Sequence, residues 1–191
     1  MGRAGGLERQ RCMNQEECRV AENRSIADGF YSMILEAPLA AAAAASGQFV
    51  HVTCEGSQLC RPISICESFP AEGRLRLVYE VRGAGTAWMA RRRAGDTIRI
   101  LAPLGHGFTP PKGCSHPVLV GGGLGVPPLL QLAKGLEMPA ALLGFRSGNV
   151  AILADDFRRA GARVEVATDD GSMGRQGLVT DLLRERIGAG Q

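Results

Sequence analysis

The stretch Arg61-Pro62-Ile63-Ser64-Ile65 places a bend, a cation and a hydroxyl within four residues. Pro62 fixes its own φ and favours an extended Arg61, so the guanidinium leaves the backbone in a defined direction and can bind a pyrophosphate through two nitrogens. In a regular strand Ser64 shares the face of Pro62, where its hydroxyl can donate or accept a hydrogen bond. The stretch therefore suits a planar ligand that carries phosphate. An edge strand with an exposed arginine is the alternative that needs no ligand.

Residues on both sides of this stretch form short β-prone runs separated by turns. The run 74–81 alternates polar and apolar residues with period two, which indicates a half-buried strand. The predicted strands, which suit antiparallel pairing, are 17–22, 30–36, 48–53, 74–81 and 97–101. The alanine tract 40–45 could form a helical turn, because alanine has the highest helix propensity, but it is too short to stand alone, so we interpret it as an adaptable connection. Gly83 opens a predicted helix that ends at the arginines 91–93.

After a linker at Pro110, Pro111 and Gly113, the pattern changes to alternating strands and helices. The predicted strands are 117–120, 140–145 and 164–168, and the predicted helices are 127–135, 152–160 and 179–186. Such alternation implies a parallel sheet covered by helices. The sequence therefore predicts a flexible arm over residues 1–15, an antiparallel β domain over 16–112 and an α/β domain over 113–191.

Composition narrows the possible functions. The chain has 191 residues, of which 45% are hydrophobic, and a net charge of +3. This charge is too weak and too dispersed to indicate nucleic-acid binding, and the arginines 91–93 suit a solvated helix end. No run of about 18 apolar residues could span a bilayer, and residues 1–12 lack a secretory pattern. We expect a protein of the cytoplasm without a membrane partner.

The cysteines and histidines give no metal signature. Cys54, Cys60 and Cys66 recur at six-residue intervals, but no Cys-x-x-Cys pair occurs in the sequence. This spacing suits neither structural zinc nor the usual iron–sulfur loops. The three histidines are far apart and show no paired-ligand interval. We therefore predict free thiols and no metal ligands.

The glycine loop 121–125 follows the first strand of the α/β region. It satisfies neither Gly-x-Gly-x-x-Gly nor the P-loop pattern. Its backbone could approach a pyrophosphate closely at a helix N-terminus, but a tight strand-to-helix turn without ligand explains the spacing equally well.

Taken together, these motifs resemble those of a known flavoprotein family. Arg61 and Ser64 match the Arg-x-x-Ser flavin motif of the ferredoxin reductase superfamily. The other motifs are 103–108 (Pro-Leu-Gly-x-Gly-Phe), 121–129 (Gly-Gly-Gly-Leu-Gly-Val-Pro-Pro-Leu), 144–147 (Gly-Phe-Arg-Ser), 168–177 (Thr-Asp-Asp-Gly-Ser-x-Gly-x-x-Gly) and 179–181 (Val-Thr-Asp). In order and separation they closely resemble the electron transfer subunits of NAD-dependent dihydroorotate dehydrogenase, over residues 17–187. This resemblance implies an antiparallel Greek-key flavin barrel followed by a ferredoxin-reductase-like nucleotide domain.

The resemblance also implies site residues. Arg61 would hold the FAD pyrophosphate, and Ser64 would lie close to the reacting flavin ring as the catalytic residue. The remaining residues implied for FAD are Pro62, Ile63, Val78, Tyr79, Glu80, Gly85 and Thr86. Glu80 departs from close relatives, which place an arginine beside the tyrosine. The residues implied for NAD(H) are Gly122, Gly123, Gly125, Asp169 and Asp170.

Asp169 and Asp170 lie much farther beyond the glycine loop than the usual acidic residue that reads the ribose, so the resemblance is what leads us to expect NADH rather than NADPH. Carboxylates can accept hydrogen bonds from ribose hydroxyls and repel a 2′-phosphate. Asp169 and Asp170 could instead cap the turn at Gly171. Arg146 and Arg175 leave another possibility open, since an arginine near the same ribose could accommodate the phosphate.

The family continues into a Cys-Gly-Pro strand and a cysteine-rich loop that binds a [2Fe-2S] cluster, whereas this sequence stops at Gln191. We therefore expect an incomplete nucleotide domain, and a cluster in a full-length form alone. The resemblance implies electron transfer between NAD(H) and FAD and an FMN-containing dihydroorotate dehydrogenase catalytic subunit, in pyrimidine biosynthesis. The alternatives are a flavin reductase or sulfhydrogenase-type subunit, or an FAD-binding module without catalytic activity.

Overall fold

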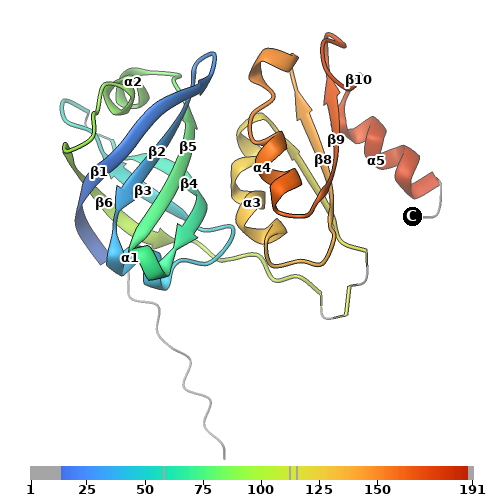
Figure 1. Cartoon of the computed structure of the whole chain (residues 1–191). Coiled ribbons are helices and arrows are strands. Elements are labelled where there is room, and N and C mark those ends of the chain that lie inside the picture. The colour runs from blue at the N-terminus through green and yellow to red at the C-terminus, as the bar shows by residue number, and fades with distance from the viewer. Residues whose placement is uncertain (1–13, 58, 112, 115, 189–191) are drawn as a thin grey trace, which may run out of the picture.

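The computed structural model describes residues 14–57, 59–111, 113–114 and 116–188 (Figure 1). Most of the predicted arm, residues 1–13, lies outside this range. Asn14 and Gln15, which we assigned to the arm, belong instead to the first strand, where they pair with Ala102 and Leu101. The first strand therefore includes residues that the composition of the N-terminus had led us to assign to the arm.

The first half of the chain is a closed six-stranded antiparallel barrel. Its strands are β1 (Asn14–Ala27), β2 (Phe30–Glu36), β3 (Phe49–Thr53), β4 (Arg61–Phe69), β5 (Arg74–Glu80) and β6 (Thr97–Leu104). Around the barrel they follow the order β1-β2-β5-β4-β3-β6. The strand β6 returns to lie beside β3 after the run β3-β4-β5, which is the Greek-key arrangement that we predicted.

Every second side chain of β5 points into the barrel core, as the alternating sequence pattern predicted. Leu75, Leu77 and Tyr79 are all 1% exposed or less and belong to the barrel core. Arg76 and Val78 take the opposite face, toward the second half of the chain. Period two therefore separates the residues that close the barrel from those that meet the parallel sheet.

Two short helices lie on the barrel. The helix α2 (Ala84–Ala90) confirms the helix predicted after Gly83. Its last turn is held by Asn23 of β1, whose Nδ2 donates to the carbonyls of Met89 at 3.0 Å and Arg92 at 2.9 Å. The Arg92 guanidinium packs over the ring of Trp88 at 4.4 Å from its centroid, so this arginine does more than face solvent.

The interpretation of the alanine tract as a connection was wrong, because residues Pro38–Ala43 form the helix α1. Pro38 occupies its first turn, where a missing N–H costs nothing. The Glu16 carboxylate, which is far away in sequence, accepts hydrogen bonds from the N–H groups of Leu39 at 3.2 Å and Ala40 at 3.1 Å. A tertiary cap therefore stabilises a helix that is too short to form alone.

The second half is a four-stranded parallel sheet with the order β10-β9-β8-β7. The strands are β7 (Val118–Gly122), β8 (Ala140–Phe145), β9 (Arg163–Thr168) and the unpredicted β10 (Arg175–Gln176). The helices are α3 (Pro127–Ala133), α4 (Ala154–Arg159) and α5 (Val179–Gly188). Figure 1 shows α3 and α4 between the sheet and the barrel, with α5 on the far face.

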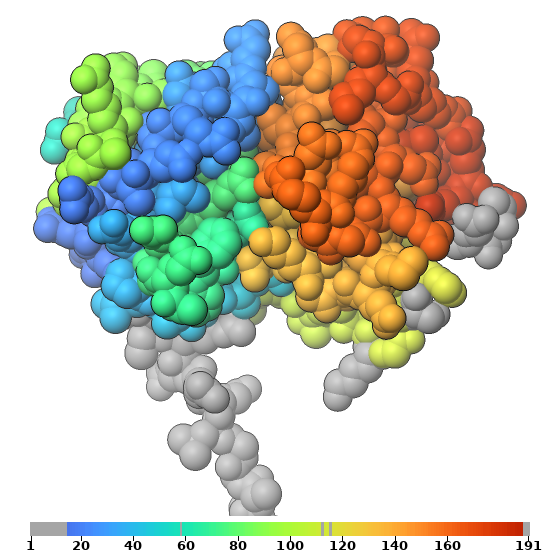
Figure 2. Space-filling model, viewed as in Figure 1, coloured from blue at the N-terminus to red at the C-terminus, as the bar shows by residue number. Residues whose placement is uncertain are grey.

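A shared apolar cluster joins the barrel to the α3–α4 layer. Phe30, Cys66 and Val78 from the barrel pack in one buried cluster with residues of α3, α4 and the parallel sheet. In the space-filling view the two halves meet along a continuous contact (Figure 2). Within the described residues, no helix has the length and apolar character needed to cross a membrane.

Candidate functional site

The start of β4 lies against the start of α2. A Cβ added to Gly85 would come within 2.2 Å of the Nε atom of Arg61, so the arginine side chain occupies the space beside this glycine. Arg61 also donates to the Ser57 hydroxyl at 3.0 Å. The structure therefore brings together Arg61 and Gly85, both of which the resemblance implied for FAD.

Thr86 shapes the turn that precedes α2. Its Oγ1 accepts hydrogen bonds from the N–H groups of Arg82 at 2.9 Å and Gly83 at 3.2 Å. The hydroxyl therefore holds the chain in a tight entry to the helix. In this arrangement Thr86 positions the turn with its side chain, and contact with a ligand would come from the backbone nearby.

Pro62 and Ser64 share a face of β4, as predicted. Pro62 is exposed and Ser64 is half-buried, whereas Ile63 and Ile65 are 8% and 1% exposed in the barrel core. The apolar side chain of Ile63 therefore serves the barrel, and the hydroxyl of Ser64 faces outward.

The structure does not bring the Tyr79 side chain into the site. Tyr79 is 1% exposed, its ring stacks with that of Tyr31 at 5.9 Å, and its hydroxyl donates to Asn23 Oδ1 at 3.1 Å. Burial raises the pKa of this hydroxyl above its ordinary value. Val78 is 2% exposed and packs toward the parallel sheet. Both residues could therefore touch a cofactor through their backbone alone.

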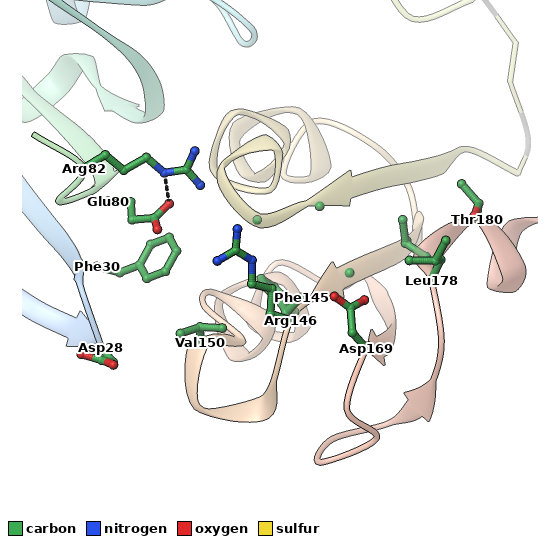
Figure 3. Close-up of a pocket in the computed structure, with 14 residues that line it drawn as sticks. Asp28, Phe30, Glu80, Arg82, Phe145, Arg146, Val150, Asp169, Leu178 and Thr180 are labelled. Atoms are coloured by element: carbon green, nitrogen blue, oxygen red, sulfur yellow. Dashed lines mark hydrogen bonds and ion pairs between the residues drawn. The ribbon is translucent and has the colours of Figure 1, made fainter.

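A cavity of about 510 Å³ lies where the barrel meets the carboxyl ends of β7, β8 and β9 (Figure 3). Ligands of open α/β sheets bind at this edge. The barrel contributes Asp28, Phe30, Glu80 and Arg82, and the parallel sheet with its loops contributes Gly122, Gly123, Gly144, Phe145, Arg146, Val150, Asp169, Leu178, Val179 and Thr180.

Close packing at Gly144 and Gly121, and backbone conformation at Gly123, favour glycine in and beside this cavity. A Cβ on Gly144 would lie 2.7 Å from Cβ of Val179, and a Cβ on Gly121 would lie 3.1 Å from the Gly125 carbonyl oxygen. Gly123 has φ of 51°, a left-handed conformation that favours glycine. Gly122 and Gly123 line the cavity, whereas Gly125 shapes the 3₁₀ turn 123–125 behind it.

The two aspartates have different roles in the structure. Asp169 lines the cavity. Asp170 accepts hydrogen bonds from the N–H of Ser172 at 3.0 Å and from its hydroxyl at 2.6 Å, and these bonds hold the pKa of the exposed carboxyl below its ordinary value. The turn-capping alternative therefore describes Asp170, and Asp169 alone faces the cavity.

Sequence reasoning missed Asp28, Phe30 and Arg82 as cavity residues. Arg82 donates through Nε to the Glu80 carboxylate at 2.6 Å, and Figure 3 shows the Arg82 and Arg146 guanidinium groups approaching the cavity from its two sides. A signal for Arg82 was available, because it lies two residues after Glu80 and directly before the Gly83 turn. Within the described residues, no group of three His, Cys, Asp or Glu side chains could hold a metal ion.

The chain matches curated proteins over most of its length, although no protein-family model matches it. It is 39% identical over 184 residues to the dihydroorotate dehydrogenase B (NAD(+)) electron transfer subunit of Bacillus caldolyticus. It is 38% identical over 183 residues to the subunit of the same name from Geobacillus kaustophilus. Each match covers 91% of this chain and 71% of the relative.

Solved structures share the fold. The NADH-dependent reduced ferredoxin-NADP oxidoreductase, described as a flavin-based electron-bifurcating protein, superposes with a TM-score of 0.81 at 28% identity. The match covers 89% of this chain and 63% of that protein, so this chain spans less than two thirds of it. Ferredoxin-NADP+ reductase from Plasmodium falciparum matches with a TM-score of 0.74 at 12% identity, over 92% of this chain and 80% of its own length.

The identity of 38–39% over 91% of this chain and 71% of each relative establishes the family. The arrangement of a barrel followed by a parallel sheet agrees with it. The chain belongs to the electron transfer subunits of dihydroorotate dehydrogenase B (NAD(+)).

Proposed function

We propose that the protein binds FAD on the barrel and moves electrons between NAD(H) and a partner flavoprotein. The observation that carries the proposal is the contact between Arg61 and Gly85, which leaves a permanent cation beside the first N–H groups of α2. A cation and unpaired N–H groups together suit a diphosphate. In this role Arg61 holds the FAD pyrophosphate, and the backbone at Gly85 lies close enough to contribute.

The cavity between the barrel and the parallel sheet is the proposed site of the nicotinamide nucleotide. Gly122 and Gly123 present backbone without side chains, and Arg146 supplies a cation for a phosphate. Asp169 supplies an acceptor for ribose hydroxyls. Bound FAD supplies the chemistry of hydride acceptance, while these side chains bind and orient the donor.

Ser64 is the proposed residue beside the reacting ring. Its hydroxyl faces outward from the strand that begins with Arg61, so one strand carries both the phosphate contact and the ring contact. A hydroxyl can donate or accept, and therefore suits a ring nitrogen whose protonation changes during the reaction. The residue orients the ring through this hydrogen bond.

We further propose that the partner is the FMN-containing catalytic subunit that interconverts dihydroorotate and orotate in pyrimidine biosynthesis. The names of the curated relatives support a catalytic partner. We place the protein in the cytoplasm, where its free cysteines would remain thiols. We assign no [2Fe-2S] cluster to the described residues, because their cysteines do not gather into a ligand set.

A flavin titration tests the FAD site. We expect the unmodified protein to bind one FAD and Arg61→Ala to lose about 2 kcal/mol, or tens-fold in affinity, because a charge-assisted contact is removed. Arg91→Ala is the matched control, since Arg91 follows the other end of α2. Equal FAD affinity in Arg61→Ala and the unmodified protein would overturn the assignment.

Reduction of bound FAD by NADH tests the activity. Bleaching of the flavin absorbance on addition of NADH, followed by electron transfer to an artificial acceptor, is the expected result. FAD binding without reduction would favour the module without catalytic activity. Reduction without coupling to a dihydroorotate dehydrogenase catalytic subunit would favour a flavin reductase, a role that the likeness to an NADH-dependent oxidoreductase also supports.

A further inference from the structure

A chain of charges with a buried centre crosses from the barrel to the helices of the parallel sheet. The Nη1 atom of Arg76 on β5 lies 2.7 Å from Glu67 Oε2 on β4 and 3.0 Å from Asp156 Oδ1 on α4. The side chains of Glu67 and Arg76 are 5% and 11% exposed. Arg76 Nε also donates to the hydroxyl of Ser32, a residue that is 3% exposed, at 3.0 Å. The Arg76 guanidinium is therefore bonded both to the barrel and to α4.

A second set of contacts reaches α3 from the same part of β4. Lys134, which follows α3, forms an ion pair with the other carboxylate oxygen of Glu67. The Gln131 side chain of α3 accepts a hydrogen bond from the backbone N–H of Ser68 at 3.0 Å. Both helices that face the barrel are therefore bonded to β4 or β5.

A bulge in β4 makes these contacts possible. Ile65 pairs with Leu77 and Glu67 pairs with Arg76, so two residues of β4 advance where β5 advances one. A bulge of this kind breaks the strict alternation of side chains. Cys66 and Glu67 consequently both face the α3–α4 layer, while Ile65 remains in the barrel core.

The same elements carry the two halves of the proposed reaction site. Ser64 lies three residues before Glu67 on β4, and α3 begins two residues after the glycine turn 123–125. One route from the proposed flavin ring contact to the nucleotide loop runs through β4, the ion pair of Glu67 with Lys134, and α3. A second contact, between Arg76 and Asp156, ties β5 to α4, which lies in the same layer as α3.

We propose that Glu67 and Arg76 are positioning residues for hydride transfer, because they fix the glycine loop and its bound nucleotide relative to the flavin held at Ser64. The inference rests on the proposed function. An apolar contact could join the two halves equally firmly, but it has no directional preference, whereas ion pairs with defined donors and acceptors favour one relative position of the two halves. Misplacement of reacting groups by about 1 Å can slow a reaction about 100-fold.

The test compares binding with chemistry in variants of the FAD-loaded protein. Glu67→Gln/Arg76→Met removes both charges together, so no buried charge is left without a partner. Arg76→Lys keeps the positive charge and replaces the branched guanidinium with a single ammonium group. Arg74→Ala is the matched control, because Arg74 lies on the same strand and pairs with Glu72 at the surface. The measurements are FAD content, the NADH dissociation constant and the single-turnover rate of flavin reduction.

We expect FAD content and the NADH dissociation constant to stay within about threefold in the double variant, and the rate of flavin reduction to fall about 10- to 100-fold. Arg76→Lys should recover part of the rate, and Arg74→Ala should match the unmodified protein. A primary kinetic isotope effect with deuterated NADH should increase as hydride transfer becomes limiting. A purely stabilising contact would lower FAD content without this change.

Two results would overturn the inference in different ways. If the unmodified protein reduces its FAD and the FAD-loaded double variant does so at an equal rate, the positioning role is wrong and the proposed function stands. If the unmodified protein binds FAD but NADH does not reduce it, the proposed function is wrong and the positioning role falls with it. If the double variant does not fold, Arg76→Lys tests the inference instead. An unchanged rate of flavin reduction in Arg76→Lys would show that the branched guanidinium of Arg76 is not needed.

Discussion

Arg61 and Gly85 lie so close that a single methyl group on the glycine would come within 2.2 Å of the arginine Nε. The contact joins the first residue of β4 to the first turn of α2, which lies 24 positions later in the chain. Nothing in either motif alone specifies this contact, yet it defines the shape of the proposed phosphate site.

The first prediction is that Gly85→Ala lowers FAD affinity without removing any charge. The added methyl group must displace the Arg61 side chain, because contacts under 3 Å are not tolerated. We expect a loss of about 10-fold, near 1.4 kcal/mol, in a fluorescence titration with FAD. Gly83→Ala is the control, since a Cβ there meets no atom within 4 Å. Equal losses in the two variants would contradict a specific role of the contact.

The second prediction separates the two aspartates. Asp169→Asn should raise the rate of flavin reduction by NADPH relative to that by NADH. The substitution removes from the cavity wall a carboxylate that would repel a 2′-phosphate. Asp170→Asn should leave this ratio unchanged, because its carboxylate faces Ser172 in the turn. Flavin reduction with each nucleotide provides the measurement. A change of preference in Asp170→Asn, with none in Asp169→Asn, would reverse the assignment.

The third prediction is that Tyr79→Phe changes stability and not flavin binding. The variant keeps the buried ring and loses one hydrogen bond to Asn23, at a cost of about 1 kcal/mol in the free energy of unfolding. Denaturant unfolding of the protein without FAD measures this cost, and an FAD titration measures the affinity. A large loss of FAD affinity would show that the hydroxyl acts at the cofactor after all.

The fourth prediction concerns alkaline pH. Burial raises the pKa of Cys18 from 9.0 to about 12, and it also raises the pKa of Cys66 and Tyr79. A pKa raised by folding stabilises the native state fully while the unfolded group is still protonated. The free energy of unfolding should therefore stay level up to about pH 9, and fall as the pH rises from there toward the folded pKa values.

Denaturant titrations at pH 7.5 and pH 10.5 measure the alkaline effect. In Cys18→Ala the decrease between these two pH values should be smaller than in the unmodified protein, because one of the raised groups is gone. Cys60→Ala is the control, since Cys60 is exposed. An equal decrease in all three proteins would show that Cys18 does not contribute to the alkaline response.

Local patterns predicted much of the fold. Period two along β5 and the alternation of strands and helices after residue 117 both depend on neighbouring residues, and the structure has them where expected. The strand β1 is longer than the predicted 17–22, because polar residues near both of its ends pair with β2 and β6 instead of forming turns. The positions where β1 begins and ends are therefore set by its pairing with other strands, and β6 is far from it in sequence.

The candidate site was predicted in outline, and its errors have a common cause. A motif assigns a residue to a site without saying whether the side chain or the backbone faces it, and Tyr79 shows the difference. The contact of Arg76 with Asp156 spans 80 residues and leaves no local pattern in the sequence. The capping of α1 by Glu16 is equally distant. Such features require the folded chain.

The hold of Asn23 on the last turn of α2 has a consequence for assembly of the flavoprotein. With seven residues, α2 is too short to persist by itself, so it depends on this amide from β1 to fix its end. The turn that would receive the cofactor phosphate opens the helix whose other end this amide fixes, so its stability depends on the pairing of β1 in the barrel. A change in β1, far from the proposed cofactor site in sequence, is therefore expected to weaken FAD binding through α2.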